Sequence, residues 1–157
     1  MTTAADIIER CAARGLTIAT AESLTAGLVA STLAEVPGCS AVLRGGVVAY
    51  AVDVKADVLG IDRELLAHVV SEPVAAALAS RACAVIGADL GIGTTGVAGP
   101  QALDGQPAGT VWIAVHDARS GRTRTRALAL DGDREAIRSG TVDACLDLVA
   151  GVLATGE

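Results

Sequence analysis

Apolar residues recur at helical spacing in three stretches of this chain, and two further helices are predicted from the strand ends and glycines that bound them. The predicted helices cover residues 3–14, a segment that follows the strand-to-helix junction 22–27 and ends near 35, residues 52–60, residues 71–87, and a last helix that begins near 131. The start at Ser71 is typical, because serine can cap a first helical turn and Pro73 fits within it.

Apolar runs of strand length separate these helices. They lie at residues 16–21, 45–50, 90–97 and 109–115. The run 45–50 begins with a double glycine and is typical of a strand that is buried on both faces of a sheet. Residues 122–126 instead alternate arginine with threonine, which predicts an antiparallel edge strand with one face toward solvent.

Strands that alternate with helices, together with one hairpin, predict an α/β fold. We expect residues 1–157 to form a single three-layer α/β/α domain with a mixed, mostly parallel sheet. Hydrophobic residues make up 52% of the chain and aromatic residues only 1%, so the core must be built from alanine, valine, leucine and isoleucine. This apolar content is compatible with a homo-oligomer.

The net charge of −6 narrows the range of expected partners. It argues against a nucleic-acid-binding surface, whereas one arginine or one helix N-terminus is enough to bind a small anionic substrate. Asp6 and Glu9 stand where a signal peptide needs basic residues, and no apolar run is long enough to span a membrane. We therefore expect a cytoplasmic protein without membrane contact.

The four cysteines are widely spaced and form no CxxC pair. This spacing is typical of small apolar residues in a reducing compartment, and it favours neither a disulfide framework nor a zinc site. We expect no metal centre. The cysteines are Cys11, Cys39, Cys83 and Cys145.

The chain contains one tyrosine, Tyr50, and one lysine, Lys55; every other basic side chain apart from the histidines is arginine. Lysine can lose its proton near neutral pH when it is buried, whereas arginine cannot. A neutral Lys55 could activate Ser40, with the Tyr50 hydroxyl relaying the proton or donating to an oxyanion. The alternative is that Tyr50 and Lys55 are ordinary surface residues in an arginine-rich chain.

Two further segments, 22–27 and 94–100, lie at the ends of predicted strands, and open α/β sheets bind ligands where strands end. Hydroxyls and backbone N–H groups at a helix start suit a phosphate, and glycines let the backbone approach a ligand. The alternatives are an ordinary helix cap and a tight turn. The candidate binding residues are Ser23, Thr25 and Gly27 in the first segment and Thr95, Gly96 and Gly99 in the second.

Several blocks, in order along nearly the whole chain, carry a resemblance to a known family. They include Thr20-Ala21-Glu22-Ser23, Pro37-Gly38-Cys39-Ser40, Gly45-Gly46-Val47-Val48-Ala49-Tyr50, Lys55, Gly96-Val97-Ala98-Gly99-Pro100, and Gly132-Asp133-Arg134 with Arg138. The chain resembles the CinA C-terminal domain family, the nicotinamide-nucleotide amidohydrolases (NMN deamidases).

The resemblance implies hydrolysis of the carboxamide of nicotinamide mononucleotide to nicotinate mononucleotide and ammonia, without a metal or cofactor. It implies that Ser40, Tyr50 and Lys55 are the catalytic residues. The phosphate would be bound by the glycine- and hydroxyl-bearing loops, Gly46 included, with Arg138 as a cation. Arg138 could equally pair with Glu135 or Asp131 on the surface.

This chain also departs from the family pattern. The family's Tyr-Ser-Asn-Glu-x-Lys run reads Tyr50-Ala51-Val52-Asp53-Val54-Lys55, and the loop 101–106 lacks the usual glycines. Two alternatives therefore stay open. One is a nucleotide-binding module with weak or no amidase activity, and the other is an amidase for another small amide.

Overall fold

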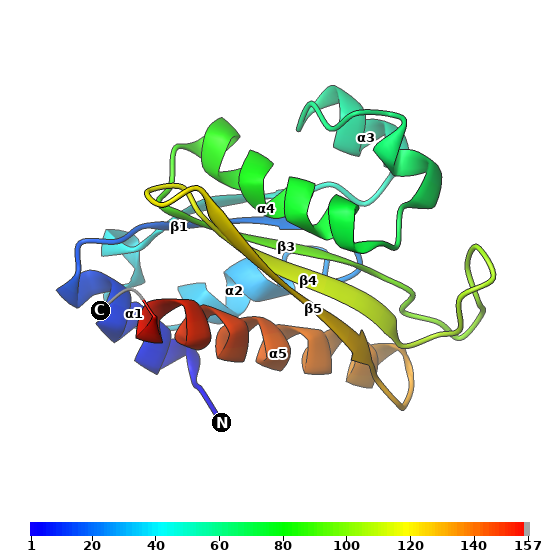
Figure 1. The fold of residues 1–157 in the computed structure, drawn as a ribbon. Helices are drawn as coiled ribbons and strands as arrows, with labels where there is room; N and C mark the ends of the chain where they lie inside the picture. Colours follow the sequence, from blue (N-terminus) through cyan, green and yellow to red (C-terminus); the bar gives the residue numbers. More distant parts are fainter. Residues whose placement is uncertain (156–157) are drawn as a thin grey trace.

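The computed structural model describes residues 1–155 as a five-stranded sheet between two layers of helices (Figure 1). The strand order is β2-β1-β3-β4-β5. Pairs β1–β2 and β1–β3 are parallel, and pairs β3–β4 and β4–β5 are antiparallel. The strands are β1 (Ile18–Glu22), β2 (Leu43–Val48), β3 (Leu90–Gly96), β4 (Thr110–Asp117) and β5 (Arg122–Ala129).

The helices divide between the two faces of this sheet. Helices α1, α2 and α5 cover one face, and α3 and α4 cover the other (Figure 1). The predicted three-layer α/β/α architecture is thus confirmed, with a larger antiparallel share than the mostly parallel sheet we expected. The helices are α1 (Ala4–Ala13), α2 (Leu28–Ala34), α3 (Val52–Asp57), α4 (Glu72–Ile86) and α5 (Arg134–Ala154), with short 3-10 turns at Cys39–Ala41 and Leu65–His68.

Helix positions that depend on local capping match the prediction. Thr3 caps α1, with its hydroxyl accepting from the Asp6 N–H and the Asp6 carboxylate accepting from the Thr3 N–H. Helix α4 starts directly after Ser71, although the Ser71 side chain makes no capping hydrogen bond, and it ends at Gly87, whose φ of 78° suits glycine. None of the described helices is both long and apolar enough to cross a bilayer.

The prediction for residues 45–50 was wrong in one respect. Strand β2 lies at the edge of the sheet and pairs only with β1. Its residues therefore alternate between partly buried and exposed positions, and Val48 is 50% exposed. A continuous apolar run does not by itself distinguish an edge strand from a central one. Strand β5, predicted as an antiparallel edge strand, is one.

Close packing of α4 on the centre of the sheet depends on two glycines of β3. A methyl group on Gly91 would collide with the backbone carbonyl of Ala79, and one on Gly93 would meet the backbone of Ala75 and Ala79. The glycines let the helix lie directly on the strand that leads into the loop after Gly96.

The three parallel strands end at one edge of the sheet. Ser23 follows β1, Tyr50 follows β2, and the loop beginning at Val97 follows β3. Chemistry-bearing residues that are far apart in sequence therefore converge at this edge.

Candidate active site

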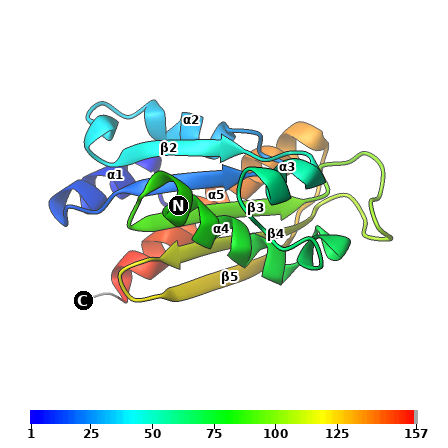
Figure 2. The ribbon, with the colours of Figure 1, turned by 90° about the horizontal axis from the view of Figure 1, so that it is seen from above.

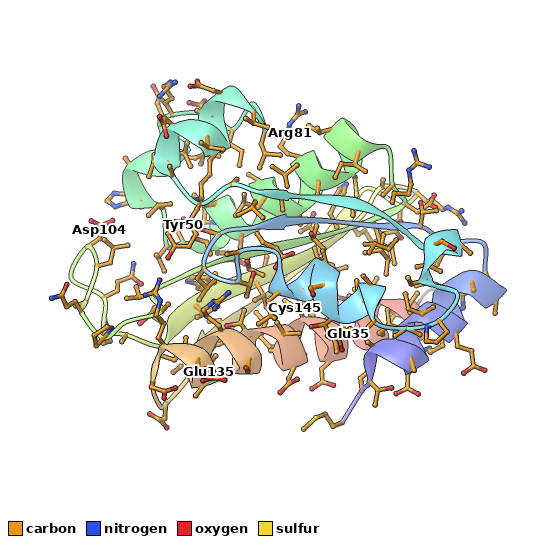
Figure 3. The ribbon with its side chains drawn as sticks, turned by 180° about the vertical axis from the view of Figure 1, so that it is seen from behind. Glu35, Tyr50, Arg81, Asp104, Glu135 and Cys145 are labelled. Atoms are coloured by element: carbon orange, nitrogen blue, oxygen red, sulfur yellow. The ribbon has the colours of Figure 1, made fainter. Side chains whose placement is uncertain are left out.

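A cavity of about 320 Å³ opens at the carboxyl ends of β1, β2 and β3. Its walls combine apolar and polar groups, and the apolar side chains include valines, alanines and Leu103 from several loops. The polar side chains that line it are Ser23, Tyr50, Lys55, Thr95, Gln101 and Arg134. Figure 3 shows that Tyr50, the loop carrying Asp104 and the first turn of α5 at Glu135 lie at the same end of the molecule.

Lys55 is held by three oxygen atoms inside this cavity. Its Nζ donates to Ser23 Oγ at 3.0 Å, to the Ala49 carbonyl at 2.7 Å and to the Tyr50 carbonyl at 2.9 Å. The residue is only 1% exposed. The single lysine of the chain is therefore a buried side chain in contact with a serine hydroxyl, not a surface residue.

Burial lowers the pKa of Lys55 from 10.5 to about 8, because desolvation penalises the charged ammonium. A neutral amine has two N–H donors and one lone pair. If the two backbone carbonyls take both donors, the lone pair faces the Ser23 hydroxyl. The arrangement can therefore act as a general base on serine close to neutral pH.

Ser23 is positioned by the turn from β1 into α2. Its backbone N–H donates to the Thr94 carbonyl at 3.1 Å, which ties this turn to β3. The carboxylate of the preceding residue, Glu22, is fully buried and accepts from the N–H groups of Val29 at 2.8 Å and Ala30 at 3.1 Å. Glu22 therefore fixes the start of α2 relative to the strand that carries Ser23.

The Glu22 contacts occupy backbone donors that were expected to bind a phosphate at segment 22–27. The first N–H groups of α2 are already bound by the Glu22 carboxylate. The Thr25 hydroxyl shares a hydrogen bond of 2.9 Å with the Thr94 hydroxyl, and Gly27 forms the left-handed cap of α2. Neither lines the cavity. Of the three predicted residues here, only Ser23 does.

Gly46 lies outside the cavity as well. It is paired with Thr20 across β1 and β2, and a side chain at this position would collide with the Thr20 hydroxyl. That hydroxyl donates to Glu22 at 3.0 Å. Gly46 thus makes room for the buried Glu22 network and does not reach the ligand space.

Three predicted residues of the second loop do reach the cavity: Thr95, Gly96 and Gly99 line it. The Thr95 hydroxyl donates to the Val69 carbonyl at 2.7 Å. This bond links β3 to the segment before α4, and Val69 also lines the cavity. The loop that follows Gly99 supplies one wall.

Arg138 was predicted to bind substrate or to pair with Glu135 or Asp131, and the structure supports neither role. Its Nε donates to the Leu24 carbonyl at 2.9 Å, and its Nη2 donates to the Thr25 carbonyl at 3.0 Å. Arg138 therefore stabilises the turn after Ser23, and it is not among the residues that line the cavity.

Tyr50 lines the cavity, but its hydroxyl makes a different contact from the predicted one. Its backbone carbonyl binds Lys55, whereas its hydroxyl accepts from Arg134 Nη2 at 2.7 Å. Among residues 1–155, the hydroxyl contacts neither Ser23 nor Lys55. The geometry therefore gives no support to a proton relay through Tyr50.

Ser40 is not brought into the site. It lies in the short 3-10 turn Cys39–Ala41, before the first residue of β2, whereas Tyr50 and Lys55 come after the last one. The six residues of β2 separate these positions by about 20 Å at about 3.3 Å per residue. Figure 2 shows the segment before β2 and helix α3 at opposite ends of the strand. Ser40 is exposed, and the serine in contact with Lys55 is Ser23.

Arg134 is the main residue that sequence reasoning missed. It lines the cavity from the first turn of α5. The block Gly132-Asp133-Arg134 was noted as part of the resemblance, but nothing in the sequence showed that the arginine faces Tyr50. No group of three histidine, cysteine, aspartate or glutamate side chains in the described part of the chain could hold a metal ion.

Comparison with known proteins connects this geometry to a family. Residues 1–153 match the CinA C-terminal domain. A CinA-like protein of Frankia casuarinae is 48% identical over 143 residues, which cover 90% of this chain and 33% of that protein. A protein of Geobacillus kaustophilus, named as competence-damage inducible, is 52% identical over 134 residues, which cover 83% of this chain and 32% of that protein. The chain spans about a third of the length of these curated relatives.

Solved structures agree over almost the full length. A CinA superfamily protein from Klebsiella pneumoniae has a TM-score of 0.92 at 32% identity and covers 96% of this chain and 95% of its own. The competence/damage inducible protein CihA from Agrobacterium tumefaciens has a TM-score of 0.91 at 35% identity, covering 97% and 93%. The chain therefore belongs to the CinA C-terminal domain family.

Proposed function

We propose that this chain hydrolyses the carboxamide of nicotinamide mononucleotide to nicotinate mononucleotide and ammonia, with Ser23 as nucleophile and Lys55 as general base. The observation that carries the proposal is the 3.0 Å contact between Lys55 Nζ and Ser23 Oγ in the wall of a cavity. A buried lysine with a lowered pKa beside a serine hydroxyl is an arrangement suited to acyl transfer.

The reaction would proceed in two steps. Neutral Lys55 takes the proton of Ser23 as the hydroxyl oxygen attacks the carboxamide carbon. The resulting Lys55 ammonium gives that proton to the departing nitrogen, so that ammonia leaves and an acyl-serine remains. Water then attacks this ester with Lys55 again as base, and nicotinate mononucleotide is released.

The developing oxyanion needs a donor close to Ser23. The next residue, Leu24, lines the cavity and is buried. Its backbone N–H has no hydrogen-bond acceptor within residues 1–155. The N–H that follows a nucleophile on a strand-to-helix turn is a common oxyanion donor. We assign that role to Leu24.

The cavity walls suit an aromatic, anionic nucleotide. Its volume is at the small end for ligand pockets. Val69, Val70 and Val97 offer apolar surface to a ring, and the described lining contains no carboxylate to repel a phosphate.

A matched pair of serine variants tests the proposal. Purified protein should release ammonia from nicotinamide mononucleotide, Ser23→Ala should abolish the release, and Ser40→Ala should leave it unchanged. Loss of activity in Ser40→Ala with full activity in Ser23→Ala would reverse the assignment. If the unaltered protein released no ammonia, the proposed amidohydrolase function would be wrong.

One observation favours a second candidate, a nucleotide-binding module without turnover. Val52 lines the cavity at the position where the resembled family carries asparagine. A lost polar contact could leave binding in place and weaken catalysis. Calorimetry that shows nucleotide binding, with no ammonia over a long incubation, would support this candidate.

A further inference from the structure

The cavity concentrates positive charge in an otherwise acidic protein. Its lining contains Lys55 and Arg134 and, within the described residues, no aspartate or glutamate. The chain as a whole carries a net charge of −6. A hollow with cations and without carboxylates attracts an anionic ligand.

Arg134 is the cation that remains available to such a ligand. Its Nη1 donates to the Gly99 carbonyl at 2.6 Å, and its Nη2 donates to the Tyr50 hydroxyl at 2.7 Å. Both acceptors are uncharged, and no carboxylate of residues 1–155 forms an ion pair with Arg134. A guanidinium has five N–H donors, so several stay free to bind an anion.

The neighbouring Arg138 has different hydrogen-bond acceptors from those of Arg134. Both of its contacts are backbone carbonyls of the turn after Ser23, and its guanidinium lies outside the lining of the cavity. Arg138 thus stabilises the turn after Ser23. Arg134 instead connects two loops at the cavity wall, since Tyr50 follows β2 and Gly99 follows β3.

We propose that Arg134 binds the phosphate of the substrate and sets the preference of this site for phosphorylated over unphosphorylated carboxamides. The substrate class rests on the function proposed above. Tyr50 and Gly99 hold the guanidinium in place before the ligand arrives. Arginine binds phosphate through two parallel N–H donors, which a lysine cannot reproduce.

The experiment compares two ligands that differ only in the phosphate, nicotinamide mononucleotide and nicotinamide riboside. Calorimetry in the Ser23→Ala background measures binding of both without turnover. Adding Arg134→Gln should weaken binding of the mononucleotide by about 10- to 100-fold and that of the riboside by less than about twofold. Arg63→Gln removes the same charge from an exposed arginine outside the cavity, and it should change neither.

A second measurement avoids dependence on the Ser23→Ala protein. Nicotinate mononucleotide and nicotinate riboside, titrated into protein that retains Ser23, should show the same phosphate-specific loss with Arg134→Gln. Equal losses for both ligands, no loss for either, or no binding of the mononucleotide would each overturn the role of Arg134. Phosphate-specific binding in a protein that releases no ammonia would instead retain this role and refute the proposed reaction.

Discussion

Ser23 and Ser40 are both serines beside the parallel half of the sheet, yet their surroundings differ completely. Ser23 follows β1 at the carboxyl edge, is nearly buried and contacts the Lys55 amine. Ser40 precedes β2 at the opposite edge, is exposed and lies outside the cavity. A serine becomes a candidate nucleophile through the groups that other strands and helices bring to it, and in the described structure the carboxyl edge of the sheet supplies them for Ser23.

The two edges differ because the carboxyl ends of the three parallel strands lie together at one of them. Their carboxyl ends deliver Ser23, the carbonyls of Ala49 and Tyr50, and the loop after Gly96 to one place. Helix α3 then returns Lys55 to the same place. At the other edge, the Ser40 side chain in the turn Cys39–Ala41 has no hydrogen-bond partner among residues 1–155.

Replacing Lys55 by methionine should have the largest effect on the Ser23 site. The change removes the base and keeps a similar apolar volume, so kcat/KM for ammonia release should fall by about 10²- to 10⁴-fold. A thermal unfolding curve would check that the variant is folded. Activity within a few fold of the starting protein would show that Ser23 is activated by something else.

Glu22→Gln should reveal how strongly the turn that carries Ser23 depends on the buried carboxylate of Glu22. One oxygen becomes an NH₂ group that faces backbone N–H donors of α2 or the Thr20 hydroxyl, so the free energy of unfolding should drop by about 1–3 kcal/mol. Denaturant titration measures this loss. Glu35→Gln, at the exposed C-terminal end of α2, is the matched control and should change stability little.

The pH dependence of the rate should follow Lys55. Its folded pKa is about 8, and only the neutral amine acts as a base, so kcat/KM should rise with pH and level off above 8. Below pH 8 it should fall about tenfold per pH unit. Measurements from pH 7 to 10 avoid the titration of the substrate phosphate near pH 6. A flat profile across this range would argue against Lys55 as the base.

Tyr50→Phe should have the smallest effect and separates two roles for the hydroxyl. If the hydroxyl only positions Arg134, KM should rise by about 2- to 10-fold with little change in kcat. A large drop in kcat at unchanged KM would restore the proton relay that the sequence suggested. Steady-state kinetics with the mononucleotide distinguishes these outcomes.

Much of the secondary structure could be predicted because it depends on residues within one or two turns. The helix starts at Thr3 and Ser71 and the stop at Gly87 are local signals, and all lie at helix ends in the structure. Lys55 could be singled out as well, since a lone lysine among arginines is visible without coordinates. The resemblance to the CinA C-terminal domain family was also visible in the sequence and is confirmed.

The contacts between distant residues could not be predicted in this way. Ser23 and Lys55 are 32 positions apart, and Tyr50 and Arg134 are 84 positions apart. Their meeting depends on strand order, which places β1 between β2 and β3 and makes β2 an edge strand. The amino-acid sequence by itself thus determined the fold class and singled out Lys55 as the one lysine of the chain. Only the tertiary structure decided which serine that lysine contacts and which arginine lines the cavity, because the packing of strands and helices brings residues from distant parts of the sequence together.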